Sequence, residues 1–364
     1  MEEVLADPVG NPSSLHAEGR AARQRIESAR RDVATLLGVA ESRVVFTGGG
    51  SEALESAIRG VLDRAPRRRR RVLVSDIEHS AVLEAAHAAE KRGFSVGRIE
   101  CGADGRVPLR EEAMQSGNDV ALVAVQWANN ETGVVQPVEE WAQACRRRGV
   151  PLLVDAVQAA GKLAVDGTRL ELDLIAVSAH KLGGPQGVGA LAVREGLNLA
   201  PLIHGGAQER RRRGGTEAVA SIAGFGAAAR AAATEQKRLS THMLKLRARV
   251  ETRLRDRFPG VTIHGEGAPR LSNTVNFALD GVPGETLVIA LDVAGFALST
   301  GSACAAGSVK PSHVLMAMGR SEVESRQAVR LSMGWNTEAA DVDRFLEAMP
   351  PLVDQVARSQ EARC

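Results

Sequence analysis

The sequence contains little cysteine and almost no net charge. Its 364 residues include four cysteines, Cys101, Cys145, Cys304 and Cys364, and none forms a CxxC pair or joins a histidine cluster at metal-ligand spacing. This pattern argues against a metal site and a disulfide framework, and it favours a reducing cytosol. The 46 basic and 44 acidic residues leave a formal charge of +2, so we expect no direct binding to nucleic acid.

Long apolar runs are also missing from the sequence. No run reaches the roughly 18 to 20 residues needed to cross a bilayer, and the N-terminal stretch MEEVLADPVGN lacks the basic and then apolar pattern of a signal peptide. We therefore expect a soluble, cytoplasmic protein that has no membrane partner. With 44% hydrophobic residues the chain can bury a sizeable core, which we expect as one large domain and a smaller one.

Short β-branched runs alternate with helical stretches along the first half of the chain. Seven runs are typical of strands: RVVFT (43–47), RVLVS (71–75), FSVGRIE (94–100), DVALVAVQ (119–126), PLLVDAV (151–157), LDLIAV (172–177) and GALAV (189–193). Unbroken apolar strands alternating with helices predict an α/β fold with a mostly parallel sheet covered on both faces. Residues 18–37 predict an amphipathic helix capped by Gly38, and the alanine-rich residues 219–257 predict a helix that links the sheet to a smaller α+β unit.

Ligands of such sheets bind beyond the carboxyl ends of the strands, and three polar features follow strands here. GGGSEALESAI (48–58) leads from a strand into a helix, so its N–H groups and the Ser51 hydroxyl form either a phosphate cradle or only a tight turn. Asp155 is either a helix cap or a charge held for a cationic ring nitrogen. Lys181, in SAHKLGG (178–184), is either a surface lysine or an amine suited to Schiff-base chemistry.

The three features together favour one cofactor. Pyridoxal 5′-phosphate requires an anion site, a carboxylate for its pyridine nitrogen and an amine for its aldehyde. The glycine turn, Asp155 and Lys181 supply these groups in that order along the chain. We therefore predict that Lys181 holds this cofactor.

Nine sequence blocks resemble the cysteine desulfurases, which are pyridoxal-phosphate enzymes of fold type I in the class V aminotransferase family. The blocks are NPSSLHAEGRAAR (11–23), FTGGGSEALESAIRG (46–60), EHSAVL (78–83), NNETGVVQP (129–137), VDAVQAAGK (154–162), SAHKLGGPQGVGAL (178–191), GGAQERRRRGGTEAV (205–219), STGSACAAGS (299–308) and VRLSMG (329–334). The chain looks more like the NifS/IscS-like group than the SufS-like group. The resemblance implies a large cofactor-binding domain, residues 1–238, with a seven-stranded sheet, and a small C-terminal domain, residues 239–364.

The resemblance also implies roles for single residues. Lys181 would hold the cofactor through a Schiff base, Asp155 would pair with the pyridinium nitrogen and Gln158 would reach the phenolic oxygen. His79 would stack on the ring face and help to move protons. The phosphate would be bound by Gly50, Ser51, Ser178 and His180. Thr216 would reach the same phosphate from the second subunit of a homodimer. Asn130 and Arg330 would bind the carboxylate of the substrate.

Cys304 is the remaining chemical residue, in the small-residue stretch GSACAAGS. Glycines and small residues on both sides suit a mobile loop better than a core, although a small buried cysteine is the alternative. By resemblance its thiolate takes sulfur from L-cysteine as a persulfide, L-alanine leaves, and the sulfur passes to an acceptor protein such as an iron–sulfur scaffold. Cys101, Cys145 and Cys364 match no family motif.

Two alternatives follow from the same residues. A selenocysteine lyase or another β-eliminating enzyme would keep Lys181, Asp155 and His79 without needing Cys304. Family members usually open with a segment like YLDNAATTP, and this sequence begins beyond that point. A truncated, non-catalytic sulfur-carrier or docking subunit is therefore the second alternative.

Overall fold

The computed structural model describes residues 1–6, 10–114, 119–301 and 310–361. The chain divides into two compact units. The first comprises residues 1–99, 109–127 and 137–236, and the second comprises residues 100–108, 128–136 and 237–364. The domain division expected at residue 238 stays a prediction.

Seven strands form the sheet of the first unit, in the order β1-β7-β6-β5-β4-β2-β3. Their bounds are β1 (Val44–Thr47), β2 (Arg71–Ser75), β3 (Ser95–Ile99), β4 (Val120–Gln126), β5 (Leu152–Asp155), β6 (Leu174–Ser178) and β7 (Gly189–Val193). β7 pairs antiparallel with β1 and β6, and the pairs among β2 to β6 are parallel. Each strand overlaps one of the seven apolar runs, with β6 ending one residue beyond its run. The expected mostly parallel sheet is confirmed.

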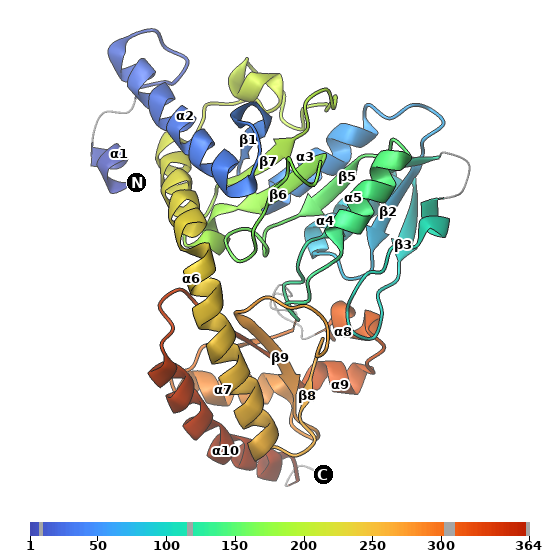
Figure 1. Ribbon diagram of the computed structural model, residues 1–364, viewed down its shortest axis with the longest axis vertical. Coiled ribbons are helices and arrows are strands. Elements are labelled where there is room, and N and C mark those ends of the chain that lie inside the picture. The colour runs from blue at the N-terminus through green and yellow to red at the C-terminus, as the bar shows by residue number, and fades with distance from the viewer. Residues whose placement is uncertain (7–9, 115–118, 302–309, 362–364) are drawn as a thin grey trace. The chain divides into compact units, whose positions relative to one another are not determined.

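Helices cover both faces of this sheet (Figure 1). On one face, α3 (Gly50–Leu62) and α4 (Ser80–Glu90) bury their apolar residues against alternate residues of the strands, such as Leu54 and Val82 against Val72 and Leu122. The intervening strand residues point to the other face, where Phe46 meets Phe225 of α6 (Val219–Arg257) edge to face at 6.2 Å. This alternation is why the strands are apolar throughout.

The remaining helices of the first unit follow local signals in the sequence. α2 (Ala17–Leu37) ends where Gly38 adopts φ 59°, the left-handed conformation expected of a glycine cap. The other short elements are α1 (Glu2–Ala6), η1 (Glu41–Arg43), η2 (Glu111–Met114), α5 (Val138–Arg147), η3 (Ala179–Leu182) and η4 (Gln208–Arg211). The expected helix over residues 219–257 is α6, which matches it at both ends.

The second unit has a four-stranded antiparallel sheet in the order β10-β11-β9-β8. Its elements are β8 (Thr262–Ile263), β9 (Thr274–Ala278), α7 (Gly284–Val293), β10 (Ser299–Thr300), α8 (His313–Ala317), α9 (Glu322–Gln327), β11 (Ala328–Ser332) and α10 (Ala339–Glu361). Phe277 of β9, Leu287 of α7 and Phe345 of α10 belong to one buried cluster with the last turns of α6. The smaller α+β unit expected toward the C-terminus is therefore present.

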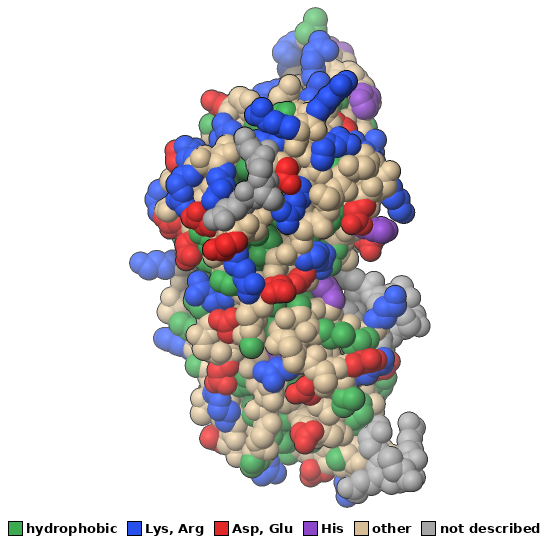
Figure 2. Space-filling model, turned by 90° about the vertical axis from the view of Figure 1, so that its right-hand side faces the viewer, with side chains coloured by type: hydrophobic (Ala, Val, Ile, Leu, Met, Phe, Trp, Pro, Cys, Tyr) green, Lys and Arg blue, Asp and Glu red, His purple; other side chains and the backbone are tan. Residues whose placement is uncertain are grey.

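The surface mixes charges of both signs. On the face drawn in Figure 2, Lys and Arg side chains are interspersed with Asp and Glu side chains, with hydrophobic side chains between them. This mixture accords with a formal charge of +2 spread over the whole chain. No helix in the described ranges is both long and apolar enough to span a membrane.

Candidate active site

The turn between β1 and α3 consists of three glycines, residues 48–50. Gly49 has φ 151° and ψ −179°, a conformation that residues with a Cβ rarely adopt. A Cβ on Gly50 would lie 3.2 Å from Val157 Cγ2 and 3.3 Å from Ser178 Cβ. The turn therefore packs directly against the segments that follow β5 and β6, and the first N–H groups of α3 favour an anion at this point.

Asp155 is the last residue of β5 and is 7% exposed. Its Oδ1 accepts a hydrogen bond from the N–H of Val157 at 2.9 Å, as a turn cap would. Burial raises the pKa of this carboxyl to about 6, and the bond to Val157 opposes the rise. Among the described residues no basic side chain pairs with Asp155, so a cationic group placed here would stabilise its ionised form.

Lys181 follows the strand next to Asp155. β6 ends at Ser178 and leads into η3, which carries His180 and Lys181, and Asp155 pairs in register with Ala176 of β6. Because parallel strands end at the same edge of the sheet, both segments lie at the edge where such sheets bind ligands. Lys181 and His180 are exposed there, and Ser178 Oγ is hydrogen bonded to His180 Nδ1 at 2.9 Å.

His79 lies at the N-terminus of α4 and is within the electrostatic field of Lys181. Its Nδ1 accepts a hydrogen bond from the N–H of Ala81 at 3.1 Å. Burial, and then the positive charge of Lys181, lower the pKa of the ring. The imidazole is therefore neutral at pH 7, and with Nδ1 as the acceptor it carries its proton on Nε2.

Gln158 lies in the turn after β5 and is half-buried. Lys162 Nζ donates hydrogen bonds to its backbone oxygen at 2.9 Å and to its side-chain Oε1 at 3.3 Å. Lys162 falls in a block that resembles the cysteine desulfurases, but no role was predicted for it. The sequence signal that could have indicated its role is its position four residues after Gln158. This spacing allows the two side chains to form a hydrogen bond across one turn.

Glu78 is a buried acid that the sequence reading also missed. It is 1% exposed, and its Oε1 accepts hydrogen bonds from Ser75 Oγ at 2.5 Å and from the N–H of Gln126 at 2.8 Å. Burial raises its pKa to about 8, and the negative charge of Asp155 adds to the rise. Glu78 is therefore protonated at neutral pH. It directly precedes His79 in the sequence and lies within the electrostatic field of Asp155.

Asn130 and Arg330 lie together in the second unit. Arg330 Nη1 donates to the backbone oxygen of Asn130 at 3.0 Å, and β11 holds Arg330 opposite Asn276 of β9 and Ser299 of β10. Arg330 is half-buried. A guanidinium group held in this way suits a planar carboxylate, which it can bind with two parallel hydrogen bonds.

Glu131 is a buried acid beside this arginine, and no role was predicted for it. Its Oε2 accepts a hydrogen bond from Ser312 Oγ at 2.5 Å, and the amide of Asn276 donates to its backbone oxygen at 3.2 Å. A Cβ on Gly301 would lie 2.7 Å from the same Oε2. Burial raises the pKa of Glu131 to about 7, whereas Ser312 and the positive charge of Arg330 oppose the rise.

Two of the expected residues are not among these groups. Thr216 is exposed in the segment that follows η4. Cys304 lies outside the described residues, as does Cys364. Cys145 is buried in α5, and burial raises the pKa of its thiol to about 12, which makes it unreactive at neutral pH.

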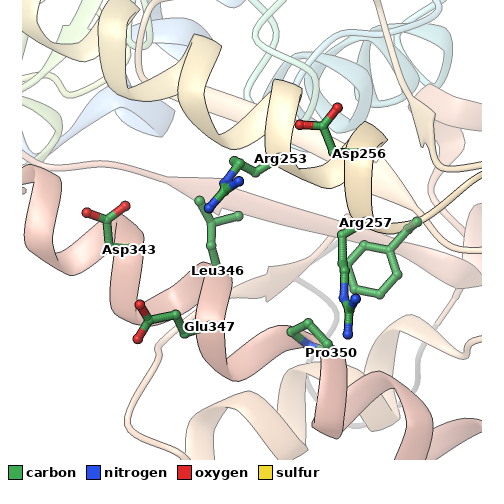
Figure 3. A pocket seen from close by; sticks show the side chains of 8 residues that line it. Arg253, Asp256, Arg257, Asp343, Leu346, Glu347 and Pro350 are labelled. Carbon is green, nitrogen blue, oxygen red and sulfur yellow. The ribbon is translucent and has the colours of Figure 1, made fainter.

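A surface groove in the second unit contains none of the expected site residues. Its volume is about 380 Å³, and its walls come from the last turns of α6, with Arg253 and Arg257, and from α10, with Asp343, Glu347 and Pro350 (Figure 3). The charged walls do not resemble the largely apolar lining of most small-molecule sites. The groove is therefore no alternative to the strand-end site of the first unit.

The strand-end site fits a cofactor that has an anionic group and a basic ring nitrogen. The buried carboxyl of Asp155 lacks a positive partner among the described residues, which suits a protonated ring nitrogen. The glycine turn approaches Ser178 closely enough to leave little space for a larger residue at Gly50, which suits an anion bound by N–H groups and hydroxyls. Lys181 is exposed at the same edge of the sheet, where its amine suits an aldehyde.

Comparisons with known proteins agree with this geometry. The aminotransferase class-V family matches residues 1–345. A cysteine desulfurase from Cereibacter sphaeroides is 42% identical over 358 residues, which are 98% of this chain and 92% of the relative. An IscS-like cysteine desulfurase from Mycobacterium tuberculosis is also 42% identical, over 96% of this chain and 91% of the relative. A solved structure of a NifS-like protein superposes with a TM-score of 0.88 at 33% identity, covering 95% of this chain and 92% of that one.

The chain therefore belongs to the aminotransferase class-V family. Its likeness to NifS-like and IscS-like proteins, expected from the nine sequence blocks, is confirmed. The expected α/β fold with a mostly parallel sheet is confirmed by the same comparisons.

Proposed function

We propose that this chain is a pyridoxal-phosphate-dependent cysteine desulfurase, which converts L-cysteine to L-alanine and passes the sulfur on as a persulfide. The observation that carries the proposal is the position of Lys181 just beyond β6, which pairs with the strand of the buried Asp155 and whose last residue, Ser178, approaches the glycine turn. The two relatives named cysteine desulfurase, each 42% identical over nearly the whole chain, support it.

The residues of the first unit would hold and tune the cofactor. Bound pyridoxal phosphate supplies an electron sink for negative charge at the substrate α-carbon. Asp155 would keep the ring nitrogen protonated, and Gly50, Ser51, Ser178 and His180 would bind the phosphate. Lys181 would hold the cofactor covalently.

His79 and Gln158 would contact the other parts of the cofactor. The neutral imidazole of His79 would lie against the ring and could donate its Nε2 proton. Gln158 would donate to the phenolic oxygen of the cofactor. Asn130 and Arg330 would bind the carboxylate of the substrate.

Cys304 would accept the sulfur. Its thiolate would attack the sulfur of the bound substrate, the Cβ–S bond would break, and Cβ would keep the electron pair. Cβ would then take up the proton that the Cys304 thiol had released, and L-alanine would leave. The enzyme would be left with a persulfide on Cys304, which a sulfur-acceptor protein such as an iron–sulfur scaffold would collect. Cys304 belongs to the part of the chain that the structure leaves undescribed, so its role rests on the resemblance.

An absorbance spectrum tests the cofactor directly. The purified protein should be yellow after incubation with pyridoxal phosphate, and Lys181→Ala should remove the colour that survives dialysis. Lys245→Ala is the matched control, because Lys245 is an exposed lysine of α6. A wild-type protein that stays colourless would contradict the proposal and leave the non-catalytic subunit as the better interpretation.

Activity assays separate the proposed reaction from elimination. With cysteine as substrate, wild type should release equal amounts of alanine and transferable sulfur. Cys304→Ala should lose desulfuration of cysteine by at least about 100-fold, as removal of a nucleophile does. Cys364→Ala is the control. Undiminished sulfide release by Cys304→Ala would instead indicate a β-eliminating lyase.

We also propose a homodimer that works in the cytoplasm, with Thr216 reaching the phosphate of the partner subunit. The exposure of Thr216 supports this, because its side chain is accessible to a second subunit. Co-expressed Lys181→Ala and Thr216→Ala chains should form mixed dimers with one intact site and regain part of the activity. Two inactive parents that give no activity together, despite forming dimers, would oppose the proposal.

A further inference from the structure

Lys162 orients a residue that the proposed function assigns to the cofactor. Its Nζ donates at 3.3 Å to Oε1 of Gln158 and at 2.9 Å to the Gln158 backbone oxygen. An ammonium group has donors and no acceptor, so the end of the amide that faces Lys162 must be the oxygen. The NH₂ end of Gln158 is thereby turned away from Lys162 and left as a donor.

The turn that carries Lys162 packs against the helix that carries Lys181. Gly161 has φ 73°, and a Cβ on it would lie 2.7 Å from Leu182 Cδ2 of η3 and 3.1 Å from Ala232 Cβ of α6. Gln236 of α6 donates to the backbone oxygen of Lys162 at 2.9 Å. The turn is therefore fixed against both helices, and Lys162 has little freedom to move away from Gln158.

Lys162 is half-buried in this position. Burial, and then the positive charge of Lys181, lower its pKa to about 8. The ammonium form still predominates at pH 7, so one positive charge is held beside Lys181.

We propose that Lys162 is a positioning residue, which turns the Gln158 amide so that its N–H donates to the phenolic oxygen of pyridoxal phosphate and which keeps a positive charge beside Lys181. This inference rests on the proposed function and deepens it. The ammonium group polarises the amide and strengthens the N–H donor at its other end. The N–H donor of Gln158 and the positive charge of Lys162 would both disfavour a proton on the Lys181 nitrogen when that nitrogen is linked to the cofactor.

Other titratable groups face the same place and must be kept constant. His79 and His180 lie within the field of Lys181, and burial and that charge lower the pKa of both rings, so they stay neutral above pH 7. Asp155 and Glu78 are the acids at this edge of the sheet. All four are unchanged in the variants below, so a difference between variants reports the charge of residue 162.

The first experiment titrates the visible absorbance of the holoenzyme with pH. Lys162→Met should raise the midpoint of the titration by about one unit, which is the effect of removing a unit charge at close range. Lys162→Arg keeps the charge and a donor and should stay within about 0.3 units of wild type. Lys245→Met, at an exposed lysine of α6, is the control and should not shift the midpoint.

The second experiment measures binding of pyridoxamine 5′-phosphate to cofactor-free protein. This ligand has the phenolic oxygen but forms no bond with Lys181, so it isolates the hydrogen bond from Gln158. Lys162→Met and Gln158→Leu should each weaken binding about 5-fold to 10-fold, the effect of one lost hydrogen bond. The double variant should bind no worse than Gln158→Leu, because Lys162 acts through Gln158.

Lys162→Gln provides a second neutral variant if Lys162→Met folds poorly, and it should shift the titration in the same direction. Unchanged titration and unchanged pyridoxamine phosphate affinity in both neutral variants would overturn the inference. That result is distinct from failure of the proposed function, because the wild-type protein would then bind pyridoxal phosphate and be yellow. A colourless wild type would overturn both.

Discussion

Arg30 of α2 and Glu209 of η4 form a buried ion pair with two parallel hydrogen bonds, each 2.8 Å long. Arg30 is 2% exposed and Glu209 is 3% exposed. Glu209 also accepts a hydrogen bond from the N–H of Phe46 in β1 at 2.8 Å. It begins three consecutive residues with φ of 43°, 55° and 64°, a left-handed stretch that costs about 1–2 kcal/mol for each residue with a Cβ. The pair therefore holds a strained turn against the sheet, shortly before Thr216.

We predict that Glu209→Gln strongly destabilises the protein. The change leaves the buried Arg30 charge with only the partly exposed Glu27 as an acidic partner, which should lower the free energy of unfolding by about 2–4 kcal/mol. Urea denaturation followed by circular dichroism measures this. The matched control is Glu139→Gln in the exposed pair between Arg169 and Glu139, where we expect about 0.5 kcal/mol or less. Similar losses for the two variants would contradict the prediction.

Glu78 should make stability depend on pH. Burial, with a smaller contribution from Asp155, raises its pKa from 4.5 to about 8, so the folded protein retains a proton that the unfolded chain has released. The contribution of this retained proton to the free energy of unfolding is fully present below about pH 4.5 and is lost as pH rises through about 8. We predict that urea unfolding shows a smaller loss of stability between about pH 6 and about pH 9 in Glu78→Gln than in wild type. Parallel pH dependences would refute this.

Asp155→Asn should separate cofactor binding from catalysis. Asparagine keeps the shape of the side chain but cannot carry the negative charge that favours a protonated ring nitrogen. We expect the variant to bind pyridoxal phosphate and remain coloured, while alanine formation from cysteine falls by at least about 100-fold. Absorbance and alanine assays on one preparation check both parts. Activity within about twofold of wild type would mean that the carboxylate plays no electrostatic role.

Glu131 should give substrate binding a pH dependence. Burial raises its pKa to about 7, so it ionises as pH rises through neutrality and its charge then offsets that of Arg330. We predict that the KM for cysteine rises with pH more steeply in wild type than in Glu131→Gln, by roughly threefold across the transition. Glu322→Gln, in an exposed pair of α9, is the control. Identical KM profiles for Glu131→Gln and wild type would exclude this coupling.

Much of the fold could be predicted from the sequence because its signals are local. Apolar runs of strand length marked all seven strands of the large sheet, and Gly38 marked the end of α2. The bounds of α6 agree with the expected range of 219–257 because helix-favouring residues continue without a proline to its end, where Pro259 and Gly260 follow.

The expected site could be predicted in part for a topological reason. Parallel strands end at one edge, so polar residues that follow β5 and β6, such as Asp155 and Lys181, were expected to meet there, and their strands are neighbours. The close approach of Gly50 to Ser178 joins the glycine turn to the same edge. The chemical roles of these residues remain predictions that the variants above test.

The sequence by itself determined which segments become strands and helices, and which residues follow the strands. Only the tertiary structure decided that Glu78 and Glu131 are buried acids with raised pKa values, that Lys162 faces the oxygen of Gln158, and that Arg30 meets Glu209 across 179 residues of chain. The physical reason is range. Periodicity and turn chemistry act over a few neighbouring residues, whereas burial, charge and hydrogen-bond partners depend on segments that meet only when the chain folds.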